Sequence, residues 1–184
     1  DTLGAGVDRR WGGLGLPPGW AADRQREQAF LMARRLAAYL ADPHRPERVG
    51  TQVPLRVDVG RATITGRVDR LERSGDGGLR VVDYKTGAAP REAFEAKALF
   101  QMKFYALVLW RSTGTVPTQL KLIYLADRDA LTYSPDEREL QALERQLDAL
   151  WAAIQRALES GEFRPHPSRL CSWCDFQALC PAYG

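Results

Sequence analysis

Residues 62–85 hold two apolar, strand-forming runs joined by the Gly-rich turn at 74–78, and this pattern constrains the fold more than any other feature. A turn of this kind between two such runs predicts an antiparallel hairpin. In the second run, Leu79–Lys85, Asp83 and Lys85 share a face with the apolar residues, because side chains two apart in a strand point the same way. A charged pair on a partly buried face is costly unless the charges are paired or hold a metal.

A second carboxylate comes close to this pair. If the turn closes a symmetric hairpin, Asp69 lies opposite Val82 or Asp83. Two carboxylates that face each other repel, and a divalent cation between them removes the repulsion. Asp69, Asp83 and the backbone carbonyl of Tyr84 are hard oxygen ligands of the kind that suit Mg²⁺ or Mn²⁺. Lys85 would orient a water or hold a phosphate, whereas the alternative is a surface ion pair of Asp83 and Lys85 on an edge strand.

The rest of the chain alternates helical and strand-like patterns. We expect an irregular lead-in over the Gly- and Pro-rich residues 1–20, a core over 21–160 and a cysteine-bearing tail over 161–184. The last long helix should begin with Ser134 as its N-cap and end at Gly161. Apolar periodicity predicts the other helices over 22–41 and 92–110, and strands over 53–59, 62–71, 79–85, 118–126 and 130–133. This order predicts one α/β domain with a central mixed β-sheet flanked by helices.

All three cysteines, Cys171, Cys174 and Cys180, lie in the tail. Their spacing is typical of metal ligands rather than of a disulfide, and their odd number agrees with that. With His166 they would form a Cys₃His zinc site. The remaining alternative is three reduced structural thiols.

Four motifs in this order resemble the RecB-family exonucleases of the PD-(D/E)XK nuclease superfamily, over roughly residues 50 to 184. They are Gly66-Arg-Val-Asp69-Arg, Asp83-Tyr84-Lys85-Thr-Gly87, Gln101-x3-Tyr105 and Cys171-x2-Cys174-x5-Cys180. The resemblance implies a restriction-endonuclease-like core.

The resemblance also implies roles for individual residues. Asp69 and Asp83 would bind the metal, Lys85 would be the catalytic lysine, and Gln101 and Tyr105 would lie beside the active site. Gln101 and Tyr105 are one helical turn apart, which agrees with a shared face. The alternative for Gln101 is a hydrogen bond within the core, and for Tyr105 it is plain packing.

In the resembling family the tail cysteines would be three of the four thiolates of a [4Fe–4S] cluster. The fourth comes from upstream, and this chain has no other cysteine. The family's upstream histidine is also missing, since the two histidines here, His44 and His166, are elsewhere, and Gln52 stands where many members have glutamate. Because the chain begins at Asp1, we expect that an N-terminal part is missing.

The function we expect is metal-dependent cleavage of DNA, as an exonuclease in DNA repair or recombination. The net charge of +3 permits an anionic partner. Sequence-independent phosphate contacts are candidates at Arg67, Arg70, Arg91 and Lys103, each of which is otherwise a solvated surface charge. The family suggests a helicase partner. No segment predicts a membrane span or a signal peptide, so we expect a cytoplasmic protein. Two alternatives stay open: a non-catalytic DNA-binding or scaffolding module, and a zinc-containing interaction domain.

Overall fold

A computed structural model of the chain describes residues 2–15, 19–89 and 92–183, with the backbone alone for 92–95. Its centre is a five-stranded sheet in the order β1-β2-β3-β4-β5. The strands are β1 (Glu47–Val59), β2 (Ala62–Arg73), β3 (Leu79–Lys85), β4 (Gln119–Tyr124) and β5 (Asp129–Tyr133). β3 and β4 run parallel and the other neighbours antiparallel, so the predicted mixed sheet is confirmed.

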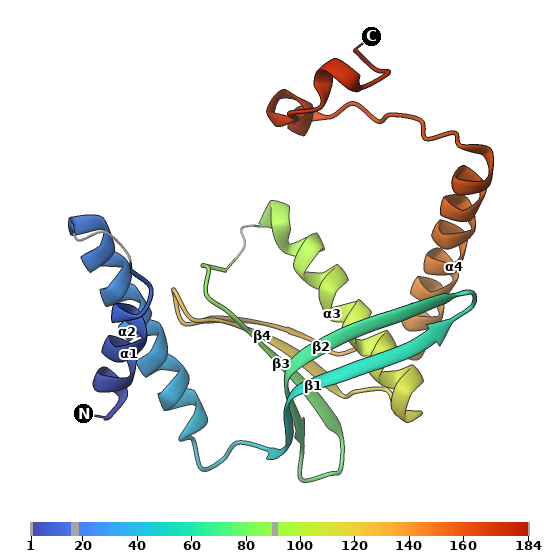
Figure 1. Cartoon of the computed structure of the whole chain (residues 1–184). Helices are drawn as coiled ribbons and strands as arrows, with labels where there is room; N and C mark the ends of the chain where they lie inside the picture. Colours follow the sequence, from blue (N-terminus) through green and yellow to red (C-terminus); the bar gives the residue numbers. More distant parts are fainter. Residues whose placement is uncertain (1, 16–18, 90–91, 184) are drawn as a thin grey trace.

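Helices cover both faces of the sheet, as Figure 1 shows. α3 (Glu92–Thr113) links the parallel strands β3 and β4, as such a pair requires, and α4 (Glu137–Ser160) packs on α3 and β1. α2 (Trp20–Leu40) lies against the opposite face and carries α1 (Thr2–Gly12) alongside it. The two short helices of the tail are η1 (Arg169–Trp173) and η2 (Gln177–Leu179).

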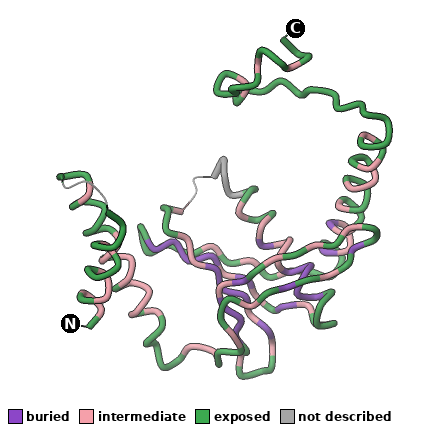
Figure 2. The backbone as a smooth tube through the Cα atoms, in the orientation of Figure 1, coloured by how far each residue is buried: buried purple, intermediate pink, exposed green. Residues whose placement is uncertain are grey.

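The core lies mainly between the sheet and α3. All of residues 106–110 of α3 are buried, because the helix lies between α4 and the strands of the sheet, the long β1–β2 hairpin included. A smaller cluster forms under α2, where Met32, Leu36 and Tyr39 pack on Val82, Ile123 and Leu125. Figure 2 shows that burial is concentrated in the sheet and α3.

Two local predictions were wrong. Residues 2–12 form α1 rather than an irregular lead-in, since the glycines at 4, 6 and 12 lower helix propensity without preventing a helix that packs on α2. α4 is capped by Asp136, whose carboxylate accepts hydrogen bonds from the amides of Arg138 and Glu139, and not by Ser134. The predicted end is confirmed, because Gly161 adopts the left-handed conformation of a C-cap with φ of 70°.

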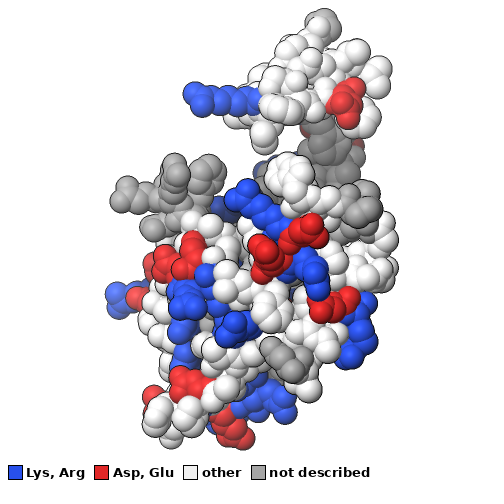
Figure 3. Space-filling model, turned by 90° about the vertical axis from the view of Figure 1, so that its left-hand side faces the viewer, with Lys and Arg blue, Asp and Glu red and all other residues white. Residues whose placement is uncertain are grey.

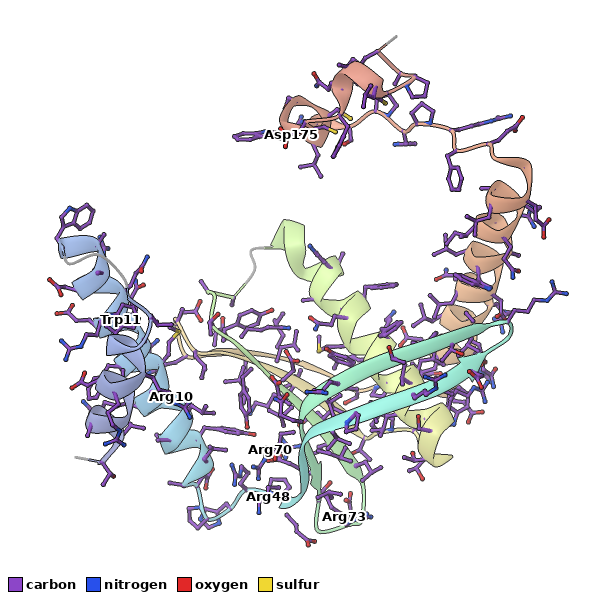
Figure 4. All side chains as sticks on the ribbon, viewed as in Figure 1. Arg10, Trp11, Arg48, Arg70, Arg73 and Asp175 are labelled. Carbon is purple, nitrogen blue, oxygen red and sulfur yellow. The ribbon has the colours of Figure 1, made fainter. Side chains whose placement is uncertain are left out.

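The tail lies apart from the sheet. In Figure 4, Asp175 of the tail is at the top of the view, whereas Arg70 and Arg73 of β2 are near the bottom. Its apolar side chains Leu170, Trp173, Phe176 and Leu179 are 70% to 86% exposed. None of the helices in the described part of the chain has the length and hydropathy of a membrane span.

Candidate metal-dependent active site

The end of β3 holds the first half of the site. Asp83 is buried, at 5% exposure, and Lys85 Nζ lies 2.7 Å from its Oδ2. The Lys85 side chain keeps 31% of its surface exposed, so the pair opens to solvent on the lysine side. Because β3 is the central strand, this is not the surface pair on an edge strand that the sequence left open.

Asp69 is fixed beside the backbone of Tyr84. The β2–β3 ladder ends where Arg70 lies opposite Val82, which confirms the predicted hairpin and leaves Asp69 next to Asp83. Beyond that point the Tyr84 amide donates to Asp69 Oδ2 at 2.8 Å, so a side-chain carboxylate takes the place of a strand carbonyl. This hydrogen bond holds the Asp69 carboxylate against the peptide that joins Asp83 to Tyr84.

Gln52 completes the surroundings of Asp69. Its Nε2 donates to Asp69 Oδ1 at 2.8 Å, from a backbone position with φ of 50°. That conformation is unusual for a residue other than glycine, and it comes two residues after the shift of the β1–β2 register between Arg48 and Gly50. The sequence marks Gln52 only as a departure from glutamate, and nothing in the strand pattern indicates that its amide binds Asp69.

The electrostatics of the site favour a cation. Burial is the largest influence on Asp83 and raises the pKa of its carboxyl, Lys85 opposes this, and the nearby Asp69 charge raises that pKa further. A carboxylate disfavoured by burial and by a like charge gains from a second positive charge close to it. Lys85 supplies one unit of charge to two carboxylates.

The residues at the site fit a small hard cation. Asp69, Asp83 and the carbonyl of Tyr84 offer oxygen donors, and Mg²⁺ commonly uses one or two carboxylates while it keeps several waters and substrate oxygens. In the described part of the chain no group of three His, Cys, Asp or Glu side chains could hold a metal. The site is therefore a two-carboxylate site whose remaining ligands would come from water and substrate.

Gln101 and Tyr105 interact with each other on α3. Gln101 Nε2 donates to the Tyr105 hydroxyl at 3.2 Å, which confirms that they share a face. Tyr105 packs beside Gly66 of β2, where an added Cβ would lie 3.6 Å from its ring. Among the described residues, no hydrogen bond or ion pair joins either side chain to Asp69, Asp83 or Lys85, so their role at the site stays a prediction.

The candidate phosphate contacts differ in whether they are free to meet a phosphate. Arg70 is buried and its Nε lies 2.6 Å from Glu72 Oε1, so it cannot meet a phosphate. Lys103 is paired with Glu139 at 3.1 Å, while Arg67 is exposed. Arg91 lies outside the described residues.

The cysteines do not assemble into a metal site in the described structure. Cys171 and Cys180 are half-buried and Cys174 is exposed. Cys171 Sγ accepts a hydrogen bond from the Ser168 amide at 3.2 Å, and this bond is the main reason that the pKa of the thiol is lowered. His166 is exposed, and the three thiols and this imidazole do not form a three-ligand group.

Comparison with known proteins agrees with this geometry. The model of the PD-(D/E)XK nuclease superfamily matches residues 1–181, from α1 to the cysteine tail. A crystal structure described as a "Putative exonuclease" from Eubacterium rectale has a TM-score of 0.55 at 16% identity, covering 95% of this chain and 71% of that one, and so shares the fold. A structure of SSO0001 has a TM-score of 0.45 at 18% identity, covering 88% and 78%.

No curated protein matches the chain. The family match spans nearly all of the sequence, and the structure has the mixed sheet flanked by helices that the sequence predicts. The chain therefore belongs to the PD-(D/E)XK nuclease superfamily.

Proposed function

We propose that this chain hydrolyses phosphodiester bonds of DNA with a divalent cation, as an exonuclease. One observation carries the proposal: the Asp69 carboxylate is hydrogen-bonded to the Tyr84 amide, immediately beside the Asp83–Lys85 ion pair. Two carboxylates and a backbone carbonyl can bind the cation, and a lysine beside them can neutralise the phosphate.

Each residue has a separable task. Asp69 and Asp83 would hold Mg²⁺ or Mn²⁺ together with the Tyr84 carbonyl. When bound, the cation polarises the phosphoryl oxygen and lowers the pKa of an attacking water. Lys85, partly exposed and 2.7 Å from Asp83, would orient that water and offset charge on the phosphate. Gln52 and the Tyr84 amide keep Asp69 in a fixed orientation.

The test is cleavage of end-labelled DNA, single-stranded and linear duplex, with Mg²⁺, Mn²⁺ or EDTA. We expect metal-dependent release of labelled product, and a loss of about 10²–10³-fold in rate for Lys85→Ala. Arg145→Ala is the control, since it removes one positive charge from an exposed position of α4. Equal activity of the Lys85 variant and the control would overturn the proposal.

A second candidate is a DNA-binding module that does not cleave. The two-carboxylate site favours it, because the described residues offer no third ionisable ligand and Gln52 is neutral where the resembling family often has glutamate. Binding of DNA without cleavage at any Mn²⁺ concentration would identify this function. Restoration of cleavage by Gln52→Glu would show that the weak ligand set is the cause.

The iron–sulfur cluster, the zinc alternative, the helicase partner and the role in DNA repair stay predictions. Metal and sulfide analysis of protein purified without oxygen tests the first two. Bound iron with acid-labile sulfide would support a cluster on Cys171, Cys174 and Cys180, whereas stoichiometric zinc would support the His166 alternative.

A further inference from the structure

A cavity of about 560 Å³ lies between α2 and the β4–β5 hairpin, on the sheet face opposite α3. Its apolar wall includes Leu31, Ile123 and Leu125. Four basic residues, Arg34, Arg35, Lys121 and Arg128, line it together with one acidic residue, Asp129. The face that bears α1 and α2 is shown in Figure 3, where Lys and Arg side chains are interspersed with acidic ones.

None of the four cations has a carboxylate partner among the described residues. Arg34 lies 6.0 Å from the centre of the Phe30 ring and Lys121 lies 5.6 Å from that of Tyr39, and neither forms an ion pair there. Arg128 also makes no ion pair with a described residue, and it adopts a positive φ of 64° at the hairpin turn. Elsewhere on the described surface, Arg26 and Arg111 are paired with carboxylates, whereas Arg67 and Arg145 form no ion pair with a described residue, so it is the grouping of four cations at one cavity that sets this site apart.

The wall also contains a polar atom without a protein partner. Arg35 donates through Nη1 to the carbonyls of Leu125 and Ala126, which fixes its guanidinium, but its buried Nε has no acceptor among the described residues. The Tyr39 hydroxyl, also buried, likewise has none, but it faces the cluster of Arg70 and Glu72 rather than the cavity. Buried polar groups in native proteins nearly always have a partner, so a water or a polar ligand is expected at this wall.

A second hollow on the same face of the sheet reaches the end of β3. This smaller hollow, of about 180 Å³, shares Leu31 and Arg35 with the first cavity and extends to Thr86. Thr86 directly follows Lys85. The two hollows together form a path from Arg128 to the end of β3, and we call this path the α2 track.

We propose that the α2 track binds the phosphate backbone of a single nucleic-acid strand that passes round the end of β3 from the active site on the other face of the sheet. Unpaired cations along a continuous path suit a polyanion, and their contacts would be independent of base sequence. This inference rests on the proposed function, because it takes the strand to be the substrate whose scissile phosphate lies at Lys85. Arg34, Lys121 and Arg128 would contact phosphates, and Arg35, held by the carbonyls of Leu125 and Ala126, would add its positive charge to the track.

Binding of fluorescently labelled single-stranded DNA, of about 20 nucleotides, tests the track by anisotropy in EDTA over a range of salt concentrations. The variant is Arg34→Gln/Arg128→Gln, which removes two charges from the track and keeps most of each side chain. The control is Arg145→Gln/Arg156→Gln, which removes the same charge from α4. Unlabelled deoxynucleoside monophosphate is added as a competitor in a separate arm.

We expect the track variant to bind about 3–10-fold more weakly, with a salt slope smaller by about 0.7 for each phosphate that it no longer neutralises, and the control to match the unchanged chain. Unchanged affinity and slope, or equal weakening in the control, would overturn the inference, and so would no binding by the unchanged chain at low salt. Competition by the monophosphate at the affinity of the strand would also overturn it, in favour of a nucleotide pocket.

The same proteins are assayed for cleavage. If none cleaves but the track variant binds more weakly than the control, the proposed function fails and the track stands. If cleavage needs Lys85 but the track variant binds normally, the track fails and the proposed function stands.

Discussion

Ionic groups lie against both faces of β3, and the two sets are built differently. On the α3 side, Asp83 is buried but its partner Lys85 keeps 31% of its side chain exposed. On the α2 side, Arg70 and Glu72 of β2 are 5% and 0% exposed and 2.6 Å apart, with Arg45 Nε at 3.6 Å from the same carboxylate oxygen. Figure 4 shows Arg70 near Arg48 and Arg73 at the end of β2.

The two sets of charges differ in whether solvent or a ligand can reach them. The α2-side cluster is closed, and it leaves Glu72 Oε2, Arg70 Nη2 and the Tyr39 and Tyr84 hydroxyls without a partner among the described residues. A closed ion pair can do little except hold the chain in place. The α3-side pair is open at Lys85, so a ligand can join it. Under the proposed function, similar charges on opposite faces of one sheet would serve structure on one side and chemistry on the other.

The largest expected effect is on the closed side. Glu72→Ala leaves Arg70 buried without its counter-charge, so we expect the free energy of unfolding to fall by about 3–5 kcal/mol. Urea unfolding measures this. The double variant Arg70→Met/Glu72→Leu should recover most of the loss, because it removes both charges together. A loss below about 1 kcal/mol in the single variant would mean that the cluster is hydrated rather than closed.

The open side should respond in activity instead of stability. Asp69→Asn keeps the size of the side chain but removes the negative charge, so we expect cleavage to fall by about 10²–10³-fold, or about 2.7–4 kcal/mol in activation free energy. Stability should change by less than about 1 kcal/mol, since the side-chain oxygen can still accept from the Tyr84 amide. If Asp69→Asn lowers stability greatly and the loss of activity follows from unfolding, the two faces do not differ as we propose.

Alkaline pH should also act through the closed side. Burial is the main cause that raises the pKa of Tyr84 to about 12. The unfolded chain then loses this proton near pH 10 while the folded chain keeps it, so stability falls as pH rises from about 10 to about 12. The slope from Tyr84 is at most about 1.4 kcal/mol per pH unit.

Tyr84→Phe should remove that part of the alkaline loss. The variant also deletes a buried hydroxyl that has no partner among the described residues, so its stability at neutral pH should be equal or slightly higher. Urea unfolding at several pH values compares the two proteins. An identical alkaline slope in both would mean that Tyr84 titrates like an exposed tyrosine.

The smallest effect should come from Asp83. Burial raises the pKa of its carboxyl, so the folded chain binds this proton more readily than the unfolded chain and the charge opposes folding above the ordinary aspartate pKa. Asp83→Asn should then raise Tm at neutral pH without metal by about 2–4 °C, or about 1 kcal/mol. Differential scanning calorimetry measures this shift. A lower Tm would show that the contact with Lys85 outweighs the cost of burial.

Much of the fold was predictable because its signals are local. The turn at 74–78 and the alternation of β3 predicted the hairpin and the shared face of Asp83 and Lys85, since both depend on residues within a few positions of each other. The N-cap of α4 was displaced by two residues, because Ser134 and Asp136 are both good caps and the choice depends on where β5 ends.

The sequence by itself determined the strand order along the chain, the hairpin that brings Asp69 next to Asp83, and the chemistry that the motifs imply. Only the tertiary structure decided that Gln52 binds Asp69, that Arg70 is buried against Glu72 and that Arg34 and Arg128 border one cavity. Each of these joins residues from different elements, or sets which face of an element is covered. Periodicity describes one element at a time, so it cannot show which neighbour will cover a face or whether water will reach a charge.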